Sequence, residues 1–157
     1  MWKYTEVNQW NTISLHDCRS DSIHIDGNDL IVDFPDGFWI LPQNQHSSYS
    51  LAVKTGPSQL CFKDYAMDAV RLYKTTRLFR CPILCRRICI EPDQLLEKVN
   101  DGKHELEFLW EFQGGTPRLY QCWLWRNNRG LEAECQFEIT ASAIEYQWNE
   151  ILPDRVW

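Results

Sequence analysis

The sequence lacks any long hydrophobic run. No stretch approaches the roughly 18 consecutive apolar residues that a membrane-spanning helix requires. The segment from Trp2 to Glu6 is polar and charged almost from the start, which excludes a secretory leader of the usual kind. We therefore expect a soluble protein with no cleaved leader and no membrane partner.

An excess of positive charge is absent as well. The chain has 16 Lys and Arg against 22 Asp and Glu, a formal net charge of -6. Proteins that bind nucleic acid normally rely on a basic surface that displaces phosphate counterions. The composition therefore predicts no nucleic-acid partner and makes a basic protein the more plausible one.

Signs of several domains are missing too, since the chain has no internal repeat, low-complexity tract or linker. Its 157 residues, 44% of them apolar and eight of them Trp, suffice for one core without metals or crosslinks. We predict a single globular domain over residues 1–157 that uses no cofactor and no metal.

The seven cysteines form an odd set, which fits a reducing cytoplasm better than a secreted disulfide framework. Cys81, Cys85 and Cys89 have the spacing C-x3-C-x3-C of some metal sites. Pro82 and its β-branched neighbours favour extended chain, however, in which the outer two cysteines lie about 26 Å apart. We interpret the three as buried structural thiols.

No constellation in the sequence specifies catalysis. The four histidines, at 16, 24, 46 and 104, have no spacing that selects a partner for a cysteine nucleophile. His16 and Asp17 could form an acid/base pair or begin a metal site, but adjacent residues of an extended chain point to opposite faces. We expect a turn in which Asp17 bonds to backbone amides and His16 is partly buried. The enzymatic alternative is a metal hydrolase that uses His16, Asp17 and another histidine.

What the chain does have is alternation. In 105–112 and 131–139, apolar residues alternate with mostly acidic ones, as in half-buried strands with a negative outer face. A turn at 127–130 is expected to join a strand over 120–125 to the strand over 131–139. The expected pairs are Tyr120 with Phe137, Cys122 with Cys135 and Leu124 with Ala133 inside, and Trp123 with Glu134 and Trp125 with Glu132 outside.

Residues 22–40 predict a three-stranded meander with glycine turns at 26–29 and 35–37. The expected pairs are Ile23 with Val32, Ile25 with Leu30, Phe34 with Phe38 and Val32 with Ile40. This register would put Trp39 opposite Asp33 on the outer face.

The remaining pattern completes a mainly β fold. Further strands are expected at 60–62, 86–90 and 144–148, the last followed by a polar tail. Residues 66–79 fit a strand or a helix, and we favour strands. One helix is expected near residues 93–100, after Pro92, with Leu95, Leu96 and Val99 as its apolar stripe. Such a series predicts an antiparallel β-sandwich or partly open barrel with one short helix.

Tryptophan beside carboxylates on the predicted outer faces indicates a surface that binds a basic protein, with indoles as anchors and acids that steer approach. The predicted partner-binding residues are Asp33, Trp39, Glu107, Trp123, Trp125, Glu132 and Glu134. The alternative is that the acids simply cover the solvated side of a sheet.

One resemblance adds a specific function. Trp10, Ile13, Leu15-His16-Asp17-Cys18 and the strand residues that follow, as far as Asp36-Gly37-Phe38, resemble the opening of immunity proteins of bacterial polymorphic-toxin and contact-dependent inhibition systems. The resemblance implies a cytoplasmic, non-enzymatic antidote that occludes a basic toxin domain, such as a nuclease.

Two other functions are open. A carbohydrate-binding or small-ligand β-sandwich module would have a concave pocket lined by Trp39, Trp110 or Trp123. A structural subunit would have a large apolar face and form a stable oligomer.

Overall fold

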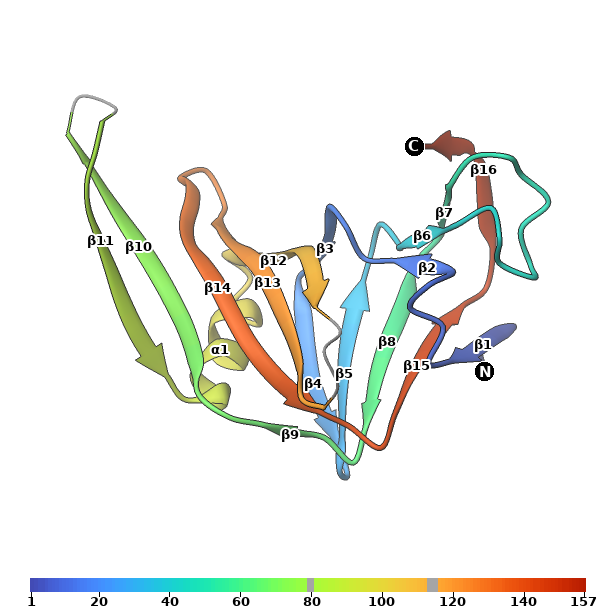
Figure 1. Ribbon diagram of the computed structural model, residues 1–157, viewed down its shortest axis with the longest axis horizontal. Coiled ribbons are helices and arrows are strands. Elements are labelled where there is room, and N and C mark those ends of the chain that lie inside the picture. The colour runs from blue at the N-terminus through green and yellow to red at the C-terminus, as the bar shows by residue number, and fades with distance from the viewer. Residues whose placement is uncertain (79–80, 113–115) are drawn as a thin grey trace.

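The structure is a computed structural model that describes residues 1–78, 81–112 and 116–157. In this part of the chain, short antiparallel strands build three sheets, and one short helix lies between strands (Figure 1). The predicted fold class is confirmed: the architecture is sandwich-like and mainly β, and the described strands do not close into a barrel.

Two large sheets form the body. Sheet A contains, in spatial order, β1 (Tyr4–Val7), β15 (Ala143–Trp148), β8 (Ser58–Lys63), β5 (Asp29–Phe34) and β4 (Ser22–Asp26). Sheet C contains β11 (Cys81–Ile90), β10 (Val70–Leu78), β14 (Gly130–Thr140), β13 (Arg118–Arg126), β12 (His104–Phe112) and β3 (Cys18–Ser20), and β9 (Ala66–Met67) pairs with the end of β14. The small sheet B contains β16 (Ile151–Val156), β7 (Val53–Thr55), β6 (Trp39–Ile40) and β2 (Ile13–Ser14).

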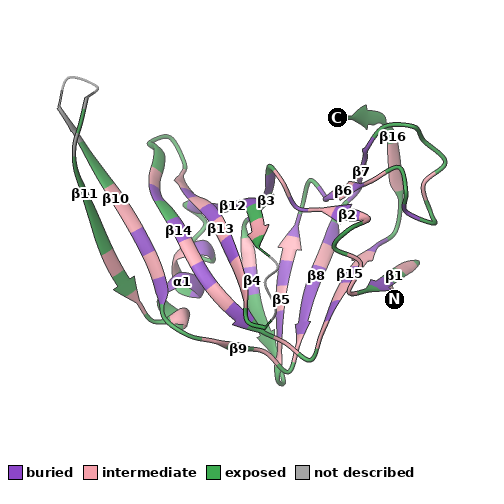
Figure 2. Cartoon of the chain, in the orientation of Figure 1, coloured by how far each residue is buried: buried purple, intermediate pink, exposed green. Residues whose placement is uncertain are grey.

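The core lies between sheets A and C because the strands alternate as their sequences predict. Purple buried positions alternate with partly exposed ones along β5, β13 and β14 (Figure 2). Aromatic contacts join the two inner faces: the ring centroids of Phe34 and Phe108 are 5.3 Å apart, and those of Phe62 and Tyr120 are 5.6 Å apart.

The registers predicted for the two clearest hairpins are confirmed. Ile23 pairs with Val32 and Ile25 with Leu30 in β4 and β5. The β13–β14 hairpin has the pairs Tyr120–Phe137, Cys122–Cys135, Trp123–Glu134 and Leu124–Ala133. In each case the turn and the apolar alternation select the same register, and a slip of one residue would expose the whole inner face.

The third strand of the predicted meander is wrong. After the turn at Gly37, which has φ +74°, the chain leaves sheet A, and β8 takes the place next to β5. Phe38 instead exchanges hydrogen bonds with Thr55, whose N–H donates to the Phe38 carbonyl at 2.9 Å and whose hydroxyl accepts from the Phe38 N–H at 3.0 Å. Trp39 therefore pairs with Ser14 and Lys54 in sheet B and does not lie opposite Asp33.

The predicted pairing of Trp125 with Glu132 is also wrong. The register shifts after Leu124, so that Trp125 pairs with Leu131. Glu132 is the extra residue of a β-bulge, which turns its side chain away from the outer face. The expected polar tail forms β16, which pairs with β7.

The helix is where it was expected. α1 (Pro92–Val99) has Pro92 in its first turn, a capping box between Glu91 and Gln94, and a buried stripe of Leu95, Leu96 and Val99. It packs against β4 and β12. Among the described residues, no helix has the length and apolar character needed to cross a bilayer.

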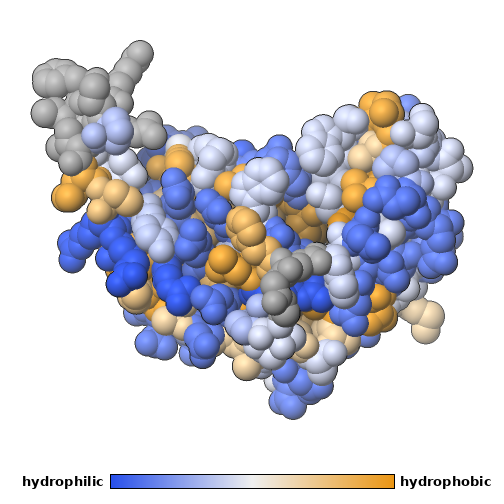
Figure 3. Space-filling view, in the orientation of Figure 1, coloured by the Kyte–Doolittle hydropathy of each residue, from blue (hydrophilic) through white to orange (hydrophobic). Residues whose placement is uncertain are grey.

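The β10–β11 hairpin projects from the body as an arm (Figure 1), and strongly hydrophilic side chains lie along the same edge of the molecule (Figure 3). Residues 70–90 contain six of the 16 basic residues and none of the 22 acidic ones, so this segment carries +6 and the rest of the chain -12. Strand β11 confirms the extended chain expected across the cysteines. The expected burial is wrong for Cys85 and Cys89, which are exposed; the side chain of Cys81 lies outside the described residues.

Candidate functional site

The seven predicted partner-binding residues do not form one surface. Glu107, Trp123, Trp125 and Glu134 come together on the outer face of sheet C, the face turned away from the core. Asp33 lies on the outer face of sheet A, where its carboxylate accepts a hydrogen bond of 2.6 Å from Gln59. Trp39 is in sheet B, and Glu132 points inward.

A single row of paired residues crosses all six main strands of sheet C on its outer face. The row runs Arg87, Tyr73, Glu134, Trp123, Glu107 and Arg19, each residue paired in register with the next. Trp123 and Tyr73 are half-buried, whereas Arg87, Glu134 and Arg19 are exposed. This face therefore combines aromatic rings with both signs of charge.

Trp123 of this row and the nearby Trp125 are held in place by neighbouring side chains. Trp123 and Trp125 pack edge to face with ring centroids 5.7 Å apart, and the Trp125 indole N–H donates to the Glu107 carboxylate. The guanidinium of Arg19 lies 5.0 Å from the Trp125 ring and 3.5 Å from Glu107. Glu107 is only 7% exposed, so its carboxylate interacts with Trp125 and Arg19 and hardly with solvent. Glu134 is the acid of the row that faces solvent.

Glu132 has a structural position beneath α1. One of its oxygens accepts from Lys74 and Lys98, each at 3.0 Å, and the other lies 2.9 Å from His104 Nε2. His104 Nδ1 is in turn 2.9 Å from Asp101. Burial would raise the pKa of Glu132, but the hydrogen bonds from Lys98, His104 and Lys74 outweigh it and lower the pKa to about 2. Glu132 thus ties the helix to β10 and β14.

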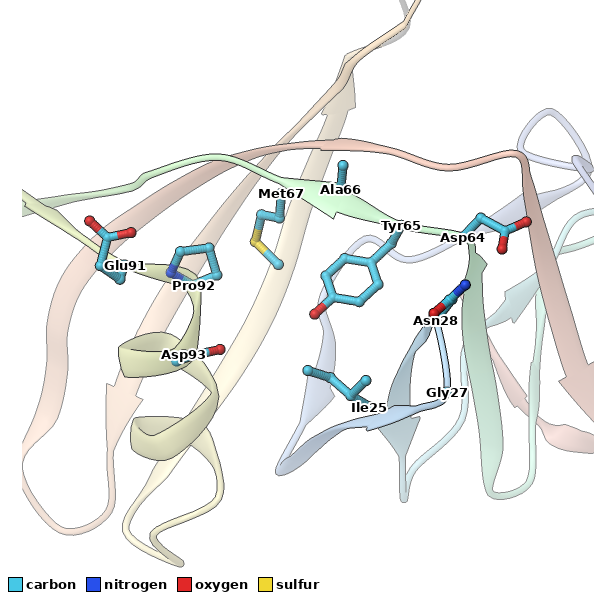
Figure 4. A pocket seen from close by; sticks show the side chains of 10 residues that line it. All are labelled: Ile25, Gly27, Asn28, Asp64, Tyr65, Ala66, Met67, Glu91, Pro92 and Asp93. Atoms are coloured by element: carbon cyan, nitrogen blue, oxygen red, sulfur yellow. The ribbon is translucent and has the colours of Figure 1, made fainter.

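One pocket lies where the β8–β9 connection passes the start of α1 (Figure 4). Its volume is about 640 Å³, and Tyr65 and Met67 extend into the space between the helix and the turn at Asn28. Burial and the nearby Asp93 carboxylate raise the pKa of Tyr65. Two carboxylates that line this pocket already have local roles. Glu91 caps the helix, and Asp64 accepts a hydrogen bond of 2.9 Å from the Ser142 hydroxyl.

A second, more aromatic pocket of about 370 Å³ lies at one end of the sandwich. We call it the indole pocket and define it by Trp10, His16, Trp110, Glu111, Tyr120 and Trp157. Of these residues, sequence reasoning offered only Trp110 as a pocket residue. Trp10 and Trp157 are far apart in the chain, and no local pattern indicates that they meet.

The turn expected at His16 and Asp17 is present, although its details differ from the expectation. Asp17 has φ +56°, and the Cys18 N–H donates to the Leu15 carbonyl at 2.9 Å. Because the chain turns here, the two side chains do not point to opposite faces: His16 Nε2 lies 3.6 Å from the Asp17 carboxylate. His16 Nδ1 is 2.5 Å from the Leu109 carbonyl oxygen, and the side chain is 25% exposed. The described residues contain no group of three potential metal ligands.

The buried cysteines are poor nucleophiles. Cys122 and Cys135 are paired across β13 and β14 as free thiols. Burial raises the pKa of Cys18 and of Cys135 to about 12 and that of Cys122 well above its ordinary value. A thiolate at any of these positions is therefore scarce at neutral pH.

Comparison with known proteins returned no matching family, curated protein or solved structure.

Proposed function

We propose that this chain is a non-enzymatic antidote that neutralises a cognate bacterial toxin by direct binding through the outer face of sheet C. The observation that carries the proposal is the pair Trp123 and Trp125. Both indoles remain partly exposed on a sheet face that no other layer covers within the described residues. The resemblance of the segment from Trp10 to Phe38 to immunity proteins supplies the class of partner.

The packing of this face favours binding. Edge-to-face contact between the indoles, the bond from Trp125 to Glu107 and the Arg19 guanidinium fix the anchor rings before a partner arrives. Side chains that are already ordered lose little entropy on association. Clustered tryptophans near the centre of an interface are the residues whose truncation weakens binding most.

The charged residues of this protein contribute to toxin binding both by local contacts and by long-range attraction. Locally, the face presents Glu134 between Tyr73 and Trp123, with Arg87 and Arg19 at the two ends of the row. At longer range, the net charge of -6, which combines -12 outside residues 70–90 with +6 in the β10–β11 hairpin at one edge of sheet C, attracts a basic toxin domain and accelerates encounter. The exposed thiols of Cys85 and Cys89 fit action in a reducing cytoplasm.

The test is calorimetric titration with the toxin domain encoded immediately upstream of the gene, at low and at high salt. We expect tight binding that weakens as salt rises, because the steering charges are screened. The double variant Trp123→Ala/Trp125→Ala should bind far more weakly. Trp2→Ala is the matched control, since Trp2 is a partly exposed tryptophan whose indole donates to Gln59 in sheet A at 3.1 Å.

Two outcomes contradict the proposal. If the wild-type protein releases no heat at either salt concentration, the antidote function is wrong. If binding is tight but the double variant and Trp2→Ala bind alike, the toxin uses another surface.

A further inference from the structure

The indole pocket has no part in the proposed function, yet it is a concave site assembled from five separate parts of the chain, one of them β13 with Tyr120. Trp10 comes from the segment between β1 and β2, His16 from the segment between β2 and β3, Trp110 and Glu111 from β12, and Trp157 from the residue after β16. Its volume of about 370 Å³ falls in the range of small-molecule sites.

The aromatic wall of this pocket is ordered by stacking. The His16 ring centroid lies 4.9 Å from that of Trp110 and 5.4 Å from that of Trp157, which in turn lies 5.6 Å from Trp39. Trp110 and Trp157 nevertheless remain 58% exposed each. Large indole surfaces that are held in place but left open to solvent are typical of binding sites.

The carboxylate that lines the pocket, Glu111, is paired with Arg118, which lies outside the lining. Glu111 Oε1 accepts from Arg118 at 2.7 Å and from the Tyr120 hydroxyl at 3.2 Å. Arg118 also lies over Trp10, 4.1 Å from the ring centroid. Within the described part of the chain, Glu111 Oε2 has no donor, so this oxygen can accept one from a ligand. Both charged side chains are 15% exposed.

We propose that the indole pocket binds a neutral sugar ring. A pyranose has one apolar face of C–H groups, which stacks on an indole, and a rim of hydroxyls, which both donate and accept hydrogen bonds. Trp110 and Trp157 supply the apolar surface, and Glu111 supplies an acceptor for a ligand hydroxyl. Because Arg118 neutralises the charge of Glu111, the site has little attraction for an ion.

The expected affinity follows from ligand size. A single sugar ring has few atoms, and small ligands of this kind bind with a Kd of roughly 1 mM, whereas a second ring that also contacts the wall binds more tightly. The disaccharides cellobiose, lactose and chitobiose, together with their monosaccharides, are therefore suitable probes.

The experiment is a titration of the full chain with each sugar, followed by tryptophan fluorescence and by the NMR signals of the indole N–H groups. We expect at least one sugar to give saturable shifts of the Trp110 and Trp157 signals, and Trp110→Ala to weaken that binding by about tenfold. Trp110 is exposed, so its replacement should leave the fold intact. Trp2→Ala is the matched control and should bind the sugar like the wild-type protein.

Three outcomes would overturn the proposal: no saturable shift with any sugar up to about 50 mM, shifts that Trp110→Ala leaves unchanged, or a response to tetramethylammonium in place of sugar, which would indicate a cation cage. Toxin binding plays no part in these measurements, so the sugar proposal and the antidote proposal fail independently.

Discussion

The outer face of sheet C and the indole pocket use the same side chain in opposite ways. On the sheet, Trp123 belongs to a row of side chains that crosses six strands and packs against Trp125, where neighbouring strands fix their register and charged residues flank them. In the pocket, Trp110 and Trp157 both pack against His16, and Glu111 is paired with Arg118. An extended aromatic and charged surface suits a partner large enough to cover it, whereas a small aromatic pocket suits a small ligand.

The largest expected effect separates the two regions directly. The double variant Trp123→Ala/Trp125→Ala should lower toxin affinity at least about 100-fold, because each indole is expected to act as a hot spot. Sugar affinity should be unchanged in the same protein. Calorimetry with each ligand measures both quantities, and a parallel loss of the two affinities would mean that the regions are one site.

A smaller effect distinguishes two acids of β14 that are close in sequence. Glu132→Gln should lower the free energy of unfolding by about 2 kcal/mol, since Lys74, Lys98 and His104 lose their shared carboxylate. Glu134→Gln, on the exposed outer face, should change it by less than about 0.5 kcal/mol. Urea unfolding measures both, and equal losses would refute the inward position of Glu132.

The difference in unfolding free energy between the wild-type protein and Glu132→Gln should depend on pH. The pKa of Glu132 is about 2 in the folded protein, below its ordinary 4.5, so its contribution is complete above pH 4.5 and is lost as pH falls toward 2. The stability gap between wild type and Glu132→Gln should therefore narrow over this interval. Unfolding curves recorded at several pH values test it; a gap that widens on acidification would contradict the ion network.

The smallest effect concerns steering. Glu134→Gln should weaken toxin binding only a few-fold at low salt, because one exposed carboxylate contributes about 0.5–1 kcal/mol. At high salt the variant and the wild type should bind alike, since screening removes the difference. Titrations at both salt concentrations provide the check. A loss that persists at high salt would place Glu134 in a desolvated contact.

Local patterns in the sequence were sufficient for much of the fold. The β4–β5 and β13–β14 hairpins and the helix at Pro92 each combine a turn or cap signal with a matching apolar period, so local and tertiary preferences agree. The same register places Trp123 beside Glu134, which is half of the candidate surface.

The rest depends on contacts that no local pattern encodes. The bulge at Glu132 leaves no signal in the sequence because apolar and polar residues alternate on both sides of it. The position of Trp39 follows from the hydrogen bonds between Phe38 and Thr55, which are 17 residues apart in the chain. The indole pocket brings Trp10 and Trp157 together across nearly the whole chain. Residues so far apart in the chain are brought together by the packing of the sheets, which local sequence patterns do not reveal.

The most direct test of two separate tryptophan sites is one NMR experiment that follows all indole N–H signals of the same sample, first with the toxin domain and then with sugar. We predict that the toxin shifts the signals of Trp123 and Trp125 and leaves Trp110 and Trp157 in place, and that the sugar does the reverse. If the toxin instead shifts Trp110 and Trp157 while Trp123 and Trp125 stay unchanged, the outer face of sheet C is not its binding surface.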